Sequence, residues 1–238
     1  MRRCVVVIPT YDEVENLPEL VPRVLGQNAG IEILIVDDAS PDGTGELAEQ
    51  LAQHEPQLHV LHRPRKEGLG PAYRAGLAEA LRLGADLIVQ MDADLSHPPE
   101  TLPVMLREIE HCDVVLGSRY KTGITVVNWP IERILLSYFG NAYVRLVTRM
   151  PISDTTGGFR CIRRTMLERM DFERIRANGY AFQIEMNHRF VRHRARIEEI
   201  PFFFHDRTRG VSKLTKRIGL EALWVAWRLR IAHLLGRG

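Results

Sequence analysis

Short apolar runs alternate with amphipathic segments along the first half of the chain. Several of the apolar runs are rich in β-branched residues, which is typical of buried strands, and they lie at residues 3–8, 31–37, 58–61, 87–91 and 114–116. The segments between them have apolar residues at helical spacing, and they lie at residues 14–25, 44–53, 72–83 and 98–110. Strands that alternate with helices predict an α/β fold with a mostly parallel central sheet flanked by helices.

The second half of the chain has a less regular pattern. Residues 134–144 include no charged side chain, and their spacing predicts a helix over 134–147 that is too short to cross a bilayer. The other expected elements are a loop at 123–130, a turn at 154–160 entering a short strand, a helix at 180–192, a strand at 197–204, a basic loop at 205–213 and an amphipathic helix at 218–235.

Polar residues follow several of the predicted strands, at residues 9–11, 37–38, 92–94 and 118–119. Pro9 is expected to end the first strand. Because the carboxyl ends of parallel strands meet at one edge of a sheet, these clusters predict a ligand site at that edge. The chain has neither a GxGxxG after the first strand nor a GxxxxGK[ST], which disfavours hydride transfer and P-loop chemistry.

Two carboxylates, Asp92 and Asp94, follow the strand at 87–91 with the small Ala93 between them. Alternate side chains of an extended chain share a face, so both carboxylates are expected to point the same way. Two such groups repel each other unless a cation lies between them, and Mg²⁺ and Mn²⁺ prefer oxygen ligands shared with substrate phosphates. The alternative is a solvated strand end whose carboxylates cap the next turn. Histidines such as His97 lack paired metal-ligand spacing and are expected to be structural or on the surface.

Charge is unevenly distributed along the 238 residues, whose net charge is +2. From Arg207 onward, eight lysines and arginines face one glutamate, so this tail has a charge of +7 and the preceding 206 residues have −5. Apolar residues interleave with this basic tail, which favours contact with phosphates or an anionic membrane. Nucleic acid is not an expected partner, because no recognition helix or aromatic-interleaved sheet accompanies the basic residues.

The three cysteines form no CxxC motif and are expected to be free thiols in a reducing compartment. The apolar run at residues 5–8 is too short for the core of a signal peptide. No apolar run reaches the length of a transmembrane helix.

Motifs from the first strand to the last loop give the sequence a family resemblance. It resembles the family-two glycosyltransferases of the GT-A fold at residues 8–16, 36–38, 40–44, 91–99 and 117–120. Within them it is most similar to dolichol-phosphate (polyprenol-phosphate) mannosyltransferases, at residues 128–130, 133, 137, 157–159, 182–185, 207 and 210–213. The resemblance covers roughly residues 4–215, and the combination of motifs is far more specific than any one of them.

The resemblance implies inverting transfer of mannose from GDP-mannose to a dolichyl or polyprenyl monophosphate. It implies that the guanosine is bound by Pro9, Tyr11, Glu13, Val36 and Asp38. It assigns the pyrophosphate to Asp92, Ala93 and Asp94 through a divalent metal, Mg²⁺ or Mn²⁺. Ser96 stands where some members have glutamine as a further metal ligand, and a hydroxyl is a weaker ligand.

Cations near the departing diphosphate supply much of the expected catalysis, since negative charge grows there. Arg207 and Lys213, on the basic loop, are expected to act with Asp94 and Arg119 as catalytic residues. Arg119, Arg133 and Ser137 are the expected binding groups for the acceptor phosphate. If the acceptor is instead a hydroxyl, Asp154 and Glu185 are candidate general bases.

The same resemblance predicts a GT-A catalytic domain over residues 1–215, with a donor half at about 1–120 and an acceptor half at about 121–215. Residues 216–238 are predicted to form an amphipathic basic helix. A polyprenyl chain stays in the membrane, so residues 126–147 and this helix, with Trp224 and Trp227, are expected to contact a membrane surface. The predicted location is therefore peripheral, at the cytoplasmic face of a membrane. Whether a small membrane subunit is a partner stays open.

Three alternatives remain at this point. One keeps the lipid acceptor and changes the donor, giving a UDP-glucose-dependent polyprenyl-phosphate glucosyltransferase. The second is a soluble family-two transferase with a hydroxyl acceptor. The third is a noncatalytic subunit that binds nucleotide and organises a membrane complex, which the intact acidic and basic motifs disfavour.

Overall fold

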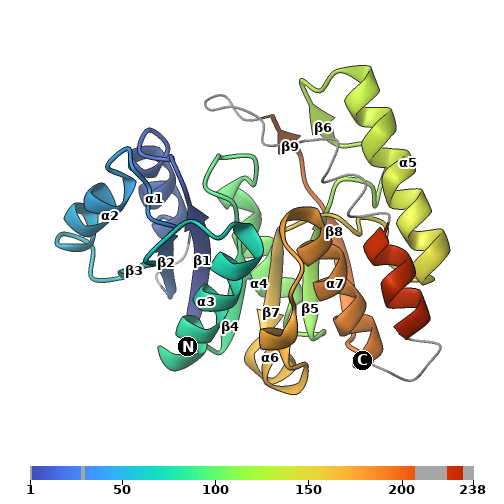
Figure 1. The fold of residues 1–238 in the computed structure, drawn as a ribbon. Coiled ribbons are helices and arrows are strands. Elements are labelled where there is room, and N and C mark those ends of the chain that lie inside the picture. The colour runs from blue at the N-terminus through green and yellow to red at the C-terminus, as the bar shows by residue number, and fades with distance from the viewer. Residues whose placement is uncertain (1, 28–29, 207–223, 233–238) are drawn as a thin grey trace.

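A seven-stranded sheet forms the centre of the protein, in a computed structural model that describes residues 2–27, 30–206 and 224–232 (Figure 1). Its strand order is β3-β2-β1-β4-β7-β5-β8. The strands are β1 Cys4–Thr10, β2 Ile31–Asp37, β3 Leu58–His62, β4 Leu87–Gln90, β5 Val114–Ser118, β7 Arg160–Arg163 and β8 Ile197–Pro201. Only β7 runs antiparallel to its neighbours in this sheet. The predicted α/β fold with a mostly parallel sheet is confirmed.

Helices cover both faces of the sheet because its central strands are apolar on both faces. Val5 and Val7 pack in one core cluster with α3 and α7, whereas Val6 and Ile8 pack in the other with α1 and α4. The helices are α1 Leu17–Leu25, α2 Thr44–Ala52, α3 Leu69–Arg82, α4 Leu102–Glu108, α5 Ile131–Thr148, α6 Arg164–Arg169 and α7 Gly179–Arg192, with 3₁₀ turns at Pro99–Thr101 and Phe172–Arg174. The alternation along β1 thus produces a three-layer domain.

Pro9 does not end the first strand as predicted, since β1 continues to Thr10. Pairing between β1 and β4 stops at Val7 and Gln90, whereas pairing with β2 continues to Thr10. The missing N–H of Pro9 would face the side of β1 where β4 has already ended, so no ladder bond is lost.

The predicted strand at 197–204 is two strands. After β8 ends at Pro201, the chain leaves the main sheet, and β9 Phe204–His205 pairs with β6 Val126–Val127. The predicted loop at 123–130 therefore contains a short strand. Both differences have one cause, a pairing between segments almost 80 residues apart in sequence that no local pattern indicates.

The last helix is described only at residues 224–232, which are helical and are joined to α7 by an ion pair of 2.6 Å between Arg228 and Glu185. Val225, Ala226 and Leu229 are buried in the core cluster that includes α7, whereas Trp224 and Trp227 are exposed. The described residues of the predicted apolar stripe, Trp224, Trp227 and Ile231, are therefore exposed, and a second apolar face attaches residues 224–232 to the domain.

No helix within the described residues combines the length and the apolar character needed to cross a bilayer. All three cysteines are free and buried, as expected. The boundary between a donor half and an acceptor half near residue 120 stays a prediction.

Candidate active site at the carboxyl edge of the sheet

Strained backbone marks the edge of the sheet where β1, β2 and β4 end. A non-glycine residue with positive φ follows each strand: Asp12 at 56°, Ala39 at 57° and Leu95 at 60°. Such conformations disfavour L-residues by roughly 1–2 kcal/mol each, and they cluster where structure serves function. Thr10 and Asp37 link the first two strand ends by a hydrogen bond of 3.2 Å between their side chains.

Asp92 and Asp94 lie beyond the end of β4, which stops at Gln90, and the chain bends at residues 93–95 instead of continuing as an extended strand. The predicted reason for their common direction is therefore wrong. Each carboxylate is instead oriented by a hydroxyl group. Tyr73 donates to Oδ1 of Asp92 at 2.8 Å, and Ser96 donates to Oδ1 of Asp94 at 2.5 Å through Oγ and at 3.1 Å through its N–H.

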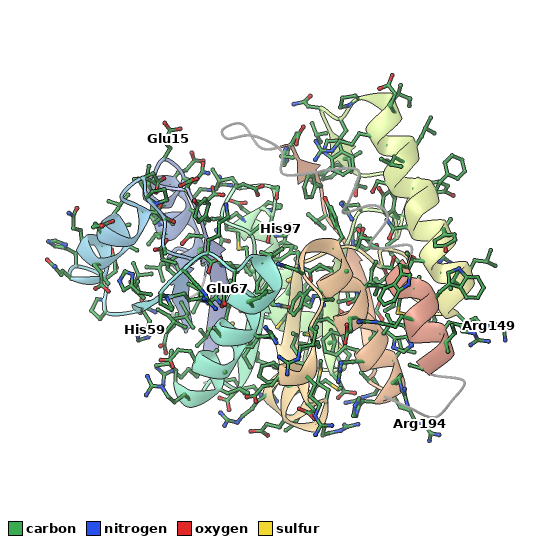
Figure 2. The ribbon with its side chains drawn as sticks, in the orientation of Figure 1. Glu15, His59, Glu67, His97, Arg149 and Arg194 are labelled. Carbon is green, nitrogen blue, oxygen red and sulfur yellow. The ribbon has the colours of Figure 1, made fainter. Side chains whose placement is uncertain are left out.

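His97 is buried and supports the same segment, which agrees with its expected structural or surface role, although this particular contact was not predicted. Its Nδ1 accepts a hydrogen bond of 3.0 Å from the Asp92 N–H, and its ring stacks on Phe159 with centroids 4.8 Å apart. Figure 2 shows His97 in the middle of the molecule. Burial lowers the pKa of this imidazole, which keeps the ring neutral and able to accept. No pattern in the sequence predicts that His97 and Tyr73 form hydrogen bonds with Asp92.

Arg119 follows β5 and is bound by a buried carboxylate. Its Nε and Nη2 donate to the two oxygens of Asp154, each at 2.7 Å, and its N–H donates to Oδ2 at 3.0 Å. Although burial opposes both charges, the ion pair lowers the pKa of the Asp154 carboxyl and raises the pKa of Arg119. A bidentate pair of this kind fixes the guanidinium plane.

The other two residues assigned to the acceptor phosphate lie on α5. Arg133 pairs with Asp206 at 2.8 Å and lies 4.0 Å above the Trp129 ring, while Ser137 accepts a hydrogen bond of 2.7 Å from Tyr120. Arg119 lies 5.7 Å from the same Trp129 ring. The structure therefore places both arginines around Trp129, which we call the arginine side of the site.

Comparison with known proteins settles the family. A family model described as glycosyl transferase family 2 matches residues 5–171, more than half of the chain. This chain belongs to glycosyl transferase family 2. The fold agrees with this membership and is the GT-A fold.

Two relatives are similar to this family 2 protein over nearly its whole length. The undecaprenyl-phosphate mannosyltransferase of Micrococcus luteus is 41% identical over 240 residues, which cover 96% of this chain and 99% of the relative. The polyprenol monophosphomannose synthase of Mycolicibacterium smegmatis is 43% identical over 233 residues, which cover 96% of this chain and 88% of the relative.

Solved structures share the fold at low sequence identity. Glucosyl-3-phosphoglycerate synthase from Mycobacterium tuberculosis, in complex with Mn²⁺, UDP and glucosyl-3-phosphoglycerate, has a TM-score of 0.67 and 18% identity and covers 100% of this chain and 81% of that one. A mannosyltransferase from Pyrobaculum calidifontis, in complex with GDP-Man and Mn²⁺, has a TM-score of 0.57 and 18% identity and covers 99% and 75%.

The donor set of the family 2 site fits a hard divalent cation. Asp92 and Asp94 offer carboxylate oxygens, and the Asp92 side chain is 35% exposed. No group of three or more His, Cys, Asp or Glu side chains that could hold a metal occurs in the part of the chain that the structure describes. A cation here would complete its shell with phosphate oxygens of the substrate, as is usual for Mg²⁺. Ser96 stays a predicted weak ligand, and its hydroxyl donates a hydrogen bond to Asp94.

Asp38, assigned to the guanosine, holds the loop that precedes α3. One carboxylate oxygen accepts from Arg63, and the other accepts from the N–H groups of Glu67 and Gly68 at 3.0 Å each. Figure 2 shows Glu67 on this loop. Both oxygens of the buried Asp38 are thus engaged within the protein.

The other guanosine residues differ in what they can offer a ligand. Val36 is fully buried in the core, so a contact through its side chain is excluded in this conformation, while Pro9 is partly exposed at the edge. Tyr11 has the Lys66 Nζ 3.3 Å above its ring. Glu13 accepts a hydrogen bond of 2.6 Å from Asn16.

The candidate general bases are both bound by arginine. Glu185 accepts from Arg228 at 2.6 Å and from Arg189 at 3.3 Å and is nearly buried, and Asp154 is paired with Arg119. Neither is placed to take a proton from a hydroxyl acceptor. Arg207 and Lys213, the predicted catalytic cations, lie outside the described residues.

Proposed function

We propose that this family 2 glycosyltransferase moves mannose from GDP-mannose to a polyprenyl monophosphate, with inversion at the sugar. The observation that carries the proposal is one edge of the sheet that holds an acid pair, Asp92 and Asp94, together with the arginine side around Trp129. An acid pair suits a metal-bound diphosphate, and arginines suit the planar oxygens of a second phosphate. The two mannose-transferring relatives, similar over 96% of this chain, support the same assignment.

Departure of GDP concentrates negative charge on the diphosphate, and groups fixed in advance stabilise that charge best. Asp92 and Asp94 would hold a divalent metal, Mg²⁺ or Mn²⁺, which neutralises the diphosphate when bound. Tyr73, Ser96 and His97 keep the two carboxylates and their bend in position. Arg207 and Lys213 are proposed as further cations at the departing group.

The proposed acceptor needs no strong general base. A phosphate monoester has its second pKa near 6 and is largely dianionic at neutral pH, so it is already a nucleophile. This chemistry agrees with Asp154 and Glu185 being paired with arginines rather than poised to accept a proton. Arg119, Arg133 and Ser137 would orient the acceptor phosphate toward the sugar carbon.

Apolar side chains on α5 and on residues 224–232 are proposed to contact the membrane that holds the lipid. On α5, Leu136, Phe139 and Leu146 are exposed, Leu146 by 78%, and Trp224 is exposed by 64%. Figure 2 shows Arg149 pointing outward at the end of α5. Exposed apolar residues flanked by arginines suit the interface of an anionic bilayer. We therefore propose peripheral attachment at the face where GDP-mannose is available, the cytoplasmic one.

The test is a transfer assay with separation of phases. The protein is incubated with labelled GDP-mannose or UDP-glucose, polyprenyl phosphate and Mn²⁺, and the organic phase is counted, with EDTA and lipid-free reactions as controls. The proposal expects label in the organic phase only with GDP-mannose, lipid and metal together. If label reaches the organic phase only with UDP-glucose, the donor is UDP-glucose rather than GDP-mannose. If label is transferred to a water-soluble acceptor without lipid, the acceptor is not a polyprenyl phosphate. The absence of transfer would support a noncatalytic subunit.

A further inference from the structure

Arg160, on β7, is a cation buried completely in the core, where it interacts with the charge of Asp92. It is among the largest side chains with no exposed surface. Its Nη2 donates to the Gly157 carbonyl at 2.7 Å and to the Gln183 side chain. Within the described ranges, no protein group accepts a hydrogen bond from its Nε or Nη1, and no carboxylate forms an ion pair with it.

Arg160 lies between the two loops that bear the acids of the site. It is the register partner of Gln90 on β4, two residues before Asp92, and both polar side-chain atoms of the buried Gln90 are likewise without a partner among the described groups. On the other side, its bond to Gly157 reaches the turn that contains Asp154. Burial lowers the pKa of Arg160 to about 10, with the charges of Asp154 and Asp92 opposing this, so it is charged at neutral pH.

A buried charge without an ion-pair partner disfavours folding, since desolvation of an ion removes several kcal/mol of stability after relaxation. An apolar side chain would pack this position with no such penalty. The position of Arg160 between Asp92 and Asp154 gives the charge a function instead. A fixed positive charge in a low-dielectric interior opposes the approach of a free cation and favours the approach of an anion.

We propose that Arg160 is a buried counter-charge that makes the acid pair bind a divalent metal together with a nucleoside diphosphate rather than the metal alone. The inference rests on the proposed function, because it takes the diphosphate as the ligand of the metal. When the metal arrives as a complex with the diphosphate, the anion offsets the repulsion by Arg160. As the sugar bond breaks, the same charge stabilises the departing diphosphate.

The experiment measures Mn²⁺ binding and GDP binding separately. Mn²⁺ alone is titrated by electron paramagnetic resonance, and GDP in saturating Mn²⁺ is titrated by calorimetry, for wild type, Arg160→Met and Arg160→Lys. Arg163→Met is the matched control: Arg163 is on the same strand, but it donates to the carbonyls of Cys112 and Glu110, away from the acids. Circular dichroism checks that each variant is folded.

Arg160→Met is expected to weaken GDP binding about tenfold, the effect of a unit charge acting across roughly 10 Å at an effective dielectric constant of about 20. Its affinity for Mn²⁺ alone should rise, a change that loss of structure would not produce, and an unchanged Mn²⁺ affinity would contradict the inference. Arg160→Lys and Arg163→Met should both bind GDP within about threefold of wild type, because both keep a positive charge at position 160.

A folded Arg160→Met protein that binds GDP as wild type does would overturn the inference. If Arg160→Met does not fold, Arg160→Lys decides: a folded lysine variant that loses more than about tenfold in GDP affinity would show that hydrogen-bond geometry, rather than charge, matters. Wild-type protein that binds no GDP with Mn²⁺ would instead contradict the proposed function.

Discussion

The two sides of the site fix their charged groups by opposite means. Asp92 and Asp94 are held by the neutral groups of Tyr73, Ser96 and His97. On the arginine side, Arg119 and Arg133 are held by the carboxylates of Asp154 and Asp206. Neutral partners leave the charge of a group intact for a ligand, whereas a charged partner offsets most of it.

This difference explains what each side can bind. The acid pair keeps its negative charge for a cation, and Arg160 is the nearby positive group that limits the binding of a free cation. The arginine side offers directed N–H groups around Trp129 with little net charge. Such a site suits a ligand that arrives already ionised and needs orientation more than attraction.

The largest expected effect removes the charge of Asp154 on the arginine side. Asp154→Asn leaves Arg119 buried and unpaired, and we expect a loss of about 3–5 kcal/mol in the free energy of unfolding. Urea denaturation measures it, with Asp206→Asn as the control on a more exposed pair, expected to lose about 1 kcal/mol or less. A similarly small loss for Asp154→Asn would show that the two pairs are equivalent.

The same pair predicts a pH dependence. The Arg119 guanidinium overcomes the effect of burial and lowers the pKa of Asp154 below its ordinary 3.8. The stabilisation is therefore complete above pH 3.8 and is lost as pH falls through the lower folded-state value. Urea midpoints from pH 5 to 2.5 should fall less steeply for Asp154→Asn than for wild type. Parallel curves would contradict this.

On the acid side, Asp94→Asn should lower transfer by about 10²–10³-fold, because the variant loses a charge that holds the metal at the departing diphosphate. Stability should change little, since the side chain can still accept from Ser96. Transfer assays at several Mn²⁺ concentrations measure the loss. Asp113→Asn, at a surface pair with Arg196, is the control. Turnover close to wild type in excess Mn²⁺ would exclude the metal role.

A smaller effect tests whether neutral partners position the acids. Tyr73→Phe removes one hydrogen bond to Asp92 and should weaken binding of Mn²⁺ with GDP by about tenfold, the usual effect of losing a group that orients a ligand. Calorimetry measures this affinity. Tyr143→Phe is the control, because Tyr143 packs against the core from α5. Equal affinities for the two variants would mean that Asp92 needs no such support.

The smallest effect concerns the surface outside the site. Trp224→Ser with Trp227→Ser should reduce binding to anionic vesicles several-fold and leave GDP binding unchanged, because both side chains are exposed and their loss leaves Val225 and Leu229 packed. Vesicle sedimentation measures it. Undiminished vesicle binding would show that these two residues are not part of the membrane-binding surface.

Much of this arrangement was predictable from local patterns. Apolar runs predicted the main strands, and the polar residues that follow them, including Asp92 and Asp94, do lie at one edge of the sheet. Those inferences depend only on neighbouring residues and on the rule that parallel strand ends converge.

What could not be predicted depends on contacts distant in sequence. The pair between Arg119 and Asp154 joins segments 35 residues apart. It fixes the orientation of the Arg119 guanidinium and engages the carboxylate of Asp154, the candidate base. Tyr73 reaches Asp92 from α3, and Val36 lies in a core cluster that includes side chains of the same helix. The bend at residues 93–95 follows the point where β4 stops pairing, which the apolar run does not indicate.

Diffraction from crystals soaked with Mn²⁺ and GDP tests the central claim most directly, since manganese can be located by its anomalous signal. We predict one manganese peak bound by both Asp92 and Asp94 and by oxygens of the GDP diphosphate. A diphosphate bound at this edge without a metal, or manganese located away from the acid pair, would contradict the account.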